Sequence, residues 1–214
     1  MVFIERIWVN PRKSNRVFYE GVVEEMSGGL NKSKLSGKII DKSWPSEKSF
    51  DITELPKQNI DDWFIYRASG HKLSYEERLK YRFKFCIDHW VNGTSWQDTG
   101  AYDFFLSAVE ILNIKTDKCY NINDIYNRYN NLDRVFEQVK REGRLRTIEE
   151  VDPSNSWEEK EPMVHIGPNL ECYFQPHGVH RFAIAYILDL KLPAQLGLVH
   201  ISSLPYLHFF KKPV

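Results

Sequence analysis

Residues 164–200 read VHIGPNLECYFQPHGVHRFAIAYILDLKLPAQLGLVH, and this stretch decides the fold that we predict. A short apolar run, a Gly-Pro-Asn turn and an aromatic run that ends before Pro176 predict two strands joined by a tight turn. Residues 179–188 contain no helix breaker and are apolar around most of the helical circumference, which is typical of a buried helix. The apolar residues 194–201, which follow Pro193, predict an interior strand.

The chemistry of this stretch lies where the second strand meets the helix, at His177-Gly178-Val179-His180-Arg181. Glycine permits a positive φ and a close approach of the backbone to a ligand. The N–H groups of a helix's first turn and the helix dipole favour an anion, and the guanidinium group of Arg181 matches phosphate oxygens. The junction therefore predicts a phosphate or carboxylate site. The alternative is a buried helix in which His180 and Arg181 make ordinary internal hydrogen bonds.

Gly178, His180, Arg181 and Ala185, placed between a pair of predicted strands and a further apolar strand, resemble the ParB/sulfiredoxin-like superfamily. The resemblance covers roughly the last third of the chain. In this superfamily a strand leads into such a loop and helix, which hold nucleotide phosphates. The resemblance therefore implies a bound nucleotide, ATP or ADP, with Mg²⁺. The residues implied to contact it are His177, Gly178, Val179, His180 and Arg181.

The loop differs from the loops of two well-known branches of this superfamily. Sulfiredoxin-like members have a reactive cysteine just before the His-Arg pair, and this chain has Val179 there. ParB-like, CTP-binding members have Gly-Glu-Arg-Arg, and Val179 and His180 replace the glutamate and the first arginine. The loop is most similar to the Gly-His-His-Arg-like loop of free-serine kinases. The resemblance thus implies a small-molecule phosphotransferase or a nucleotide hydrolase, with an unknown small-molecule acceptor.

Charged residues just before this stretch supply further candidates. Arg144 and Arg146 belong to the densest basic cluster of the chain and are candidates for phosphate or nucleic-acid contacts; alternatively, they belong to a helix end and a solvated linker. Glu149 and Glu150 are candidates for metal binding or for a general base, and otherwise are surface charge. In the phosphotransferase hypothesis the catalytic residues are Glu149, Glu150 and His180.

Seven histidines raise the question of a metal site. No H-x-x-x-H or H-E-x-x-H spacing occurs, and the three cysteines form no C-x-x-C pair. We therefore predict no metal bound by the protein alone. The histidines that would have to converge for such a site are His165, His177, His180 and His200.

The composition limits the class of protein. The 214 residues include 29 basic and 29 acidic side chains, so the formal net charge is zero. This balance implies no general affinity for polyanions and disfavours a dedicated nucleic-acid-binding protein. Three widely spaced cysteines fit a reducing compartment better than a disulfide framework. No apolar run approaches the about 18 residues of a membrane-spanning helix, so we predict a cytoplasmic protein without a membrane partner.

Upstream of the deciding stretch, the sequence predicts strands first and helices second. Residues 3–9 and 17–23 have strand-like patterning. Ser74 and Glu77 form a capping-box pattern before a first helix, and residues 101–112 predict a second. Five apolar residues at steps of three and four predict a third helix, which ends at a glycine: Ile125, Tyr129, Leu132, Phe136 and Val139.

We therefore predict an α+β protein, in which a helical middle section packs on a C-terminal ParB/sulfiredoxin-like β-α-β unit. The predicted sections are residues 1–70 with strands and loops, 71–143 with three helices, and 144–214 with the nucleotide- or phosphate-binding unit. The alternative function is a non-catalytic regulatory module that binds DNA or protein on the same scaffold. A nucleic acid is thus a less favoured partner than a nucleotide.

Overall fold

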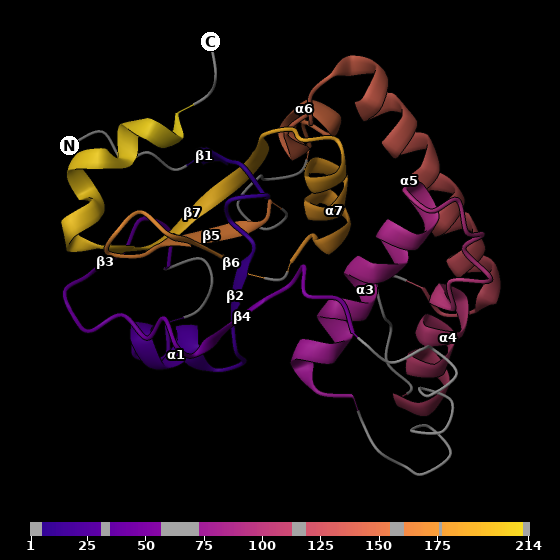
Figure 1. Ribbon diagram of the computed structural model, residues 1–214, viewed down its shortest axis with the longest axis horizontal. Helices are drawn as coiled ribbons and strands as arrows, with labels where there is room; N and C mark the ends of the chain where they lie inside the picture. Colours follow the sequence, from indigo (N-terminus) through magenta and orange to yellow (C-terminus); the bar gives the residue numbers. More distant parts are fainter. Residues whose placement is uncertain are drawn as a thin grey trace. The chain divides into compact units, whose positions relative to one another are not determined.

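The computed structural model describes residues 6–30, 35–56, 73–112, 119–154, 161–175 and 177–211. Helices and a mixed seven-stranded sheet make up this structure, which confirms the predicted α+β class. The chain forms two compact units: Met1–Glu54 joins Arg144–Val214 in one, and Leu55–Gly143 forms the other. The sheet of the first unit therefore contains strands from both the indigo start and the orange-to-yellow end of the chain (Figure 1).

The longest strand, β7, organises the sheet. The strand order is β1-β7-β5-β6-β2-β4, and β3 pairs with the last residues of β7. β7 runs parallel to β5 and antiparallel to β1, and all of its residues except His200 are buried, which confirms the predicted interior strand. The strands are β1 (Arg6–Val9), β2 (Arg16–Phe18), β3 (Ile39–Ile40), β4 (Ser49–Asp51), β5 (Met163–Ile166), β6 (Cys172–Gln175) and β7 (Leu192–His200).

A bulge interrupts the pairing of β5 with β7. The pairs Val164–Leu196 and Ile166–Val199 leave two residues of β7 opposite His165. The His165 ring lies against the bulge, and a Cβ added to Gly197 would lie 2.7 Å from its Cε1 atom. Glycine is therefore needed at this position, because the imidazole occupies the space of a side chain.

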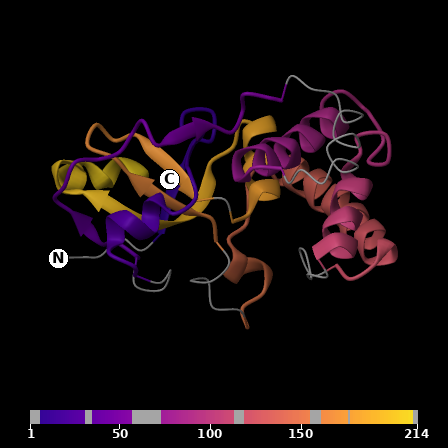
Figure 2. The same cartoon turned by 90° about the horizontal axis from the view of Figure 1, so that it is seen from below.

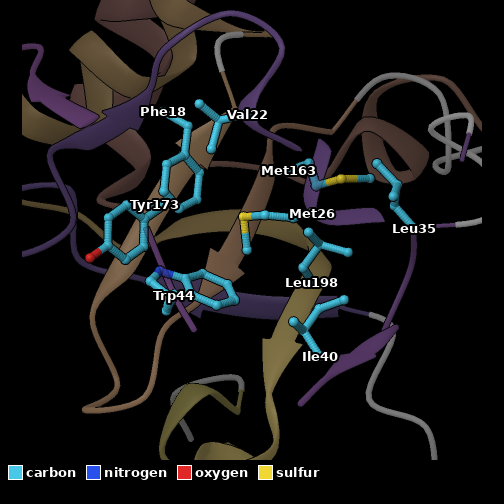
Figure 3. Close-up of a cluster of buried hydrophobic side chains, with 9 residues drawn as sticks. All are labelled: Phe18, Val22, Met26, Leu35, Ile40, Trp44, Met163, Tyr173 and Leu198. Carbon is cyan, nitrogen blue, oxygen red and sulfur yellow. The ribbon is translucent and has the colours of Figure 1, made fainter. Parts of the chain in front are cut away.

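One face of the sheet packs against α1 (Val22–Ser27). The rings of Phe18 and Tyr173 stack with centroids 4.4 Å apart, and the Trp44 ring lies 5.7 Å from both (Figure 3). Since β2 and β6 run parallel here, this stack joins the beginning of the chain to its last third. The whole cluster comprises Phe18, Val22, Met26, Leu35, Ile40, Trp44, Met163, Tyr173 and Leu198.

The region between β2 and α1 differs from the prediction of a strand through residue 23. β2 ends at Phe18, and Gly21 adopts a left-handed φ of 85° at the start of α1. Val22 and Met26 then lie four residues apart on the buried side of a short helix. The left-handed glycine ends the extended backbone and starts the helix, which the apolar pattern alone does not indicate.

The opposite face of the sheet packs against α7 (Val179–Ile187). The Phe182 ring of α7 lies 4.9 Å from the Phe174 ring of β6. The preceding residue of β6, Tyr173, belongs to the cluster on the α1 side, so successive side chains of β6 point to opposite faces of the sheet. Six of the nine residues of α7 are buried, which confirms the predicted buried helix. Two further elements complete this unit: α6 (Ile148–Val151) and the 3₁₀ helix η3 (Ile201–Phe210).

The second unit contains α3 (Tyr75–Trp90), α4 (Ala101–Leu112) and α5 (Ile122–Glu142), which form a group of packed helices (Figure 2). All three predicted helices are therefore confirmed. Ser74 and Glu77 make the predicted capping box at the start of α3. None of the helices in the described ranges combines the length and the apolar character that crossing a membrane requires.

Asp133 is a polar centre within this helical unit. Its carboxylate accepts hydrogen bonds from the indole N–H groups of Trp90 and Trp96, each at 3.0 Å. The Nε2 atom of His89 lies 3.1 Å from the same carboxylate, while its Nδ1 atom lies 2.7 Å from the Thr94 carbonyl oxygen. One side chain of α5 thus holds the end of α3 and the turn that follows it.

Candidate functional site

Gly178 starts α7 in a conformation that favours glycine. Its φ of 88° and ψ of 34° lie in the left-handed region, and its carbonyl accepts the first intrahelical bond, from Phe182 N–H, at 3.0 Å. A Cβ at this position would lie 3.1 Å from the Pro162 side chain. Without a side chain, residue 178 cannot cap the helix as Ser74, Asn121 and Thr147 do at theirs.

The first turn of α7 therefore has the backbone features of an anion site. The N–H groups of residues 179–181 precede the first carbonyl acceptor that the helix itself supplies. The helix dipole adds partial positive charge at the same end. Side chains of this turn lean towards the N-terminus, which brings the Arg181 side chain to this end of the helix.

Arg181 is held by the protein. Its Nη2 atom donates to the Arg146 carbonyl oxygen at 2.7 Å and to the Glu161 Oε2 atom at 3.2 Å. The side chain keeps an exposed fraction of 21%. Its Nε atom is buried and has no hydrogen-bond partner among the described residues. The Nη2 atom of Arg181 therefore makes the ordinary internal hydrogen bonds that were the alternative to an anion site. The Nε atom donates to none of the described residues.

Glu161 is a component of this site that the sequence did not indicate. The residue has an exposed fraction of 0%, and its Oε1 atom accepts a hydrogen bond from Ile148 N–H at 2.7 Å. Burial raises the pKa of its carboxyl group above the ordinary value, and the Arg181 charge and the Ile148 hydrogen bond oppose that rise. Several neighbouring residues in the sequence are also glutamates, so no local pattern distinguishes Glu161 from them.

The two glutamates predicted as catalytic have defined partners. Glu150 accepts a hydrogen bond from Thr147 N–H at 2.7 Å in the capping box of α6, and it pairs with Arg144 at 2.9 Å. Glu149 pairs with Arg6 at 3.1 Å and keeps an exposed fraction of 58%. Of these two carboxylates, Glu149 is the more accessible.

The four histidines considered for a metal site lie in different surroundings. His165 is buried at the bulge, and His200 caps the start of η3 on the neighbouring strand. His180 is buried in the first turn of α7, whereas His177 is exposed just before it. Within the described ranges, no group of three or more His, Cys, Asp or Glu side chains is arranged to hold a metal ion.

Comparison with known proteins adds no further assignment. No family model, no curated protein and no solved structure matches this chain. The site is therefore described by its own geometry: a left-handed glycine, an exposed histidine, a helix N-terminus and an arginine paired with a buried glutamate.

Among the described residues, the carboxylates around α7 do not form a magnesium site. Mg²⁺ prefers one or two carboxylates together with phosphate oxygens and water. Glu150 and Glu161 are each engaged by a backbone N–H group and by an arginine, and Glu149 is paired with Arg6. These carboxylates are therefore engaged within the protein, and none of the three is left to bind a metal ion alone.

Proposed function

We propose that this chain is a ParB/sulfiredoxin-like protein that binds the phosphate groups of a nucleotide, ATP or ADP, at the junction of β6 and α7. The observation that carries the proposal is the left-handed Gly178 at the uncapped start of α7. Backbone N–H groups at such a turn suit phosphate oxygens, because they donate hydrogen bonds without side-chain bulk. The buried, unused Nε donor of Arg181 also supports an anion at this end of the helix.

The reaction that we propose is transfer of a phosphoryl group to a small molecule or to water. Of the predicted catalytic residues, Glu149 is the best candidate for the base that activates the acceptor, because its carboxylate is largely exposed. Glu150 forms part of the α6 capping box, so we assign it a role in stabilising the start of α6 and none in the reaction. His180 lies in the first turn of α7, where its backbone N–H would face the phosphate. Mg²⁺ would enter as a companion of the nucleotide phosphates.

The alternative function, a regulatory module that binds DNA or protein, has weaker support. The Arg144 side chain of the predicted basic cluster is paired with Glu150, which reduces the local positive charge. Formal net charge is zero over the whole chain. The regulatory function would be favoured over nucleotide binding if the protein bound none of the nucleotides tested.

Thermal unfolding in the presence of ATP, ADP, CTP and GTP, each with and without Mg²⁺, tests the proposal. A ligand that binds only the folded state raises the midpoint of unfolding. We expect a rise with at least one nucleotide. The absence of a rise with all four, at concentrations of several millimolar, would contradict nucleotide binding.

Two variants of one exposed residue locate the binding site. His177→Glu adds a negative charge just before α7, which suits the helix dipole but repels a phosphate, whereas His177→Gln introduces a neutral side chain of similar polarity. We expect His177→Glu to weaken nucleotide binding by roughly tenfold while the unliganded protein keeps its stability. If both variants bind like the wild type, the ligand lies elsewhere.

A further inference from the structure

Glu161 is the only acidic residue among those the structure describes whose side chain is buried from solvent. Removing a carboxylate from water is unfavourable unless hydrogen bonds and an opposite charge compensate for the lost hydration. The Ile148 N–H group and the Arg181 guanidinium supply both. The charge of Glu161 is therefore tied to that of Arg181, and any second anion that approaches Arg181 competes with this carboxylate.

Glu161 contacts the first turn of α7 through the Arg181 side chain. The next residue, Pro162, contacts the site where Gly178 would carry a Cβ, and Glu161 itself holds Arg181 against the Arg146 carbonyl. The same carboxylate holds the start of α6 through Ile148. It therefore joins the segment before α6 to the first turn of α7.

A phosphate bound at this turn would place a second negative group beside Arg181. One guanidinium group would then be shared by two anions in a partly dehydrated place, where their repulsion is strong. A proton on the buried carboxyl group of Glu161 removes this repulsion. Burial already raises the pKa of that group, the charges of Arg181 and Arg6 lower it, and the charge of Glu150 raises it. The protonated carboxyl group can still accept the Ile148 N–H bond through its carbonyl oxygen.

We propose that Glu161 is the positioning residue of the phosphate site and takes up a proton from solvent when a phosphate binds. In the unliganded protein the ionised carboxylate orients Arg181 towards the Arg146 carbonyl. Phosphate binding and protonation of Glu161 together free the guanidinium group to donate to the phosphate. The ligand thus binds more tightly at lower pH. This inference rests on the proposed function, because it requires a phosphate at α7.

Isothermal titration calorimetry with ADP, in buffers that differ in ionisation enthalpy, measures the number of protons taken up on binding. The comparison includes wild type, Glu161→Gln, and Glu25→Gln as the control, because the Glu25 carboxylate is exposed and pairs with Lys48. We expect proton uptake by wild type and by Glu25→Gln in excess of that by Glu161→Gln. Titration of the ADP phosphates contributes equally to all three and cancels in the difference.

The pH dependence of the ADP dissociation constant gives the second measurement. We expect the wild-type constant to rise with pH by up to about tenfold per unit relative to that of Glu161→Gln. Equal proton uptake and equal slopes in the two proteins would overturn the inference while leaving nucleotide binding intact. Failure of wild type to bind ADP would instead overturn the proposed function, and this inference with it.

A third measurement uses wild type alone, in case Glu161→Gln does not fold. Carbon-13 NMR of glutamate-labelled protein follows the Glu161 carboxyl signal at constant pH as ADP is added. We expect that signal to move towards the protonated position. A signal that keeps its ionised position at saturating ADP would contradict the inference.

Discussion

His165 accepts a hydrogen bond from the Leu198 backbone N–H, with Nδ1 and N 2.9 Å apart, inside the bulge of β7. Because a backbone N–H only donates, the Nδ1 atom carries no proton and the neutral ring carries its proton on Nε2. The imidazole thus serves as the acceptor for the Leu198 N–H group at the point where the regular pairing of β5 with β7 is interrupted. His165 is therefore part of the backbone hydrogen bonding of the sheet as well as of its core.

This arrangement predicts that acid destabilises the sheet unit through His165. Burial lowers the pKa of His165 from 6.5 to about 4, so the unfolded chain binds a proton that the folded protein excludes between these values. The contribution of neutral His165 to the free energy of unfolding is therefore fully present above pH 6.5. It is lost as pH falls towards 4, and the loss is at most about 3 kcal/mol. Urea unfolding at pH 7 and at pH 4.5 should show a larger loss for wild type than for His165→Gln. Equal losses would contradict this prediction.

Gly197→Ala should destabilise the protein strongly, because the added Cβ would overlap the His165 ring. We expect a loss of about 2–3 kcal/mol, typical of overpacking in a buried site. The double variant with His165→Ala should recover part of this loss, since it removes the overlapping ring. Gly93→Ala is the matched control: its φ of 75° is also positive, but its Cβ would meet nothing within 4 Å, so its loss should be smaller, about 1 kcal/mol.

Asp133→Ala should destabilise the helical unit by about 2–4 kcal/mol, because two indole N–H groups and an imidazole would lose their shared acceptor. Urea unfolding followed by tryptophan fluorescence reports on this site, since Trp90 and Trp96 contact the carboxylate directly. Glu137→Ala on the same helix is the control. Its carboxylate is exposed and lies 3.8 Å from Lys140, so we expect a change within about 0.5 kcal/mol.

Arg181→Ala should cost more stability at pH 7 than at pH 5. The variant leaves the buried Glu161 carboxylate without its charge partner, which raises the pKa of that group further. A raised carboxyl pKa favours folding at low pH, and that benefit is lost as pH rises through the folded value. The difference from wild type should thus shrink as pH falls. Arg144→Ala, which removes an exposed ion pair, should change stability by less than about 1 kcal/mol at either pH.

The elements with a strong local pattern were predictable from the sequence. Helices α3, α4 and α5 carry caps or apolar spacing, and residues 164–200 contain the turn, glycine and apolar runs that set β5, β6, α7 and β7. The pairing of β1 with β7 was not predictable, because no local signal links strands so far apart. The role of Glu161 was not predictable either, because its partners Ile148 and Arg181 lie in other segments of the chain and no local pattern links them to it.

The sheet built from both ends of the chain also sets an order of folding during synthesis. β1 precedes Leu55–Gly143 in the chain and its partner β7 follows it, so β1 is made well before the strand with which it pairs. The backbone hydrogen bonds of the helices in Leu55–Gly143 are local, so these helices can form in the meantime, whereas β1 must wait for its partner strand. A nascent chain that stalls before Met163 would therefore display β1 without the strand that it pairs with.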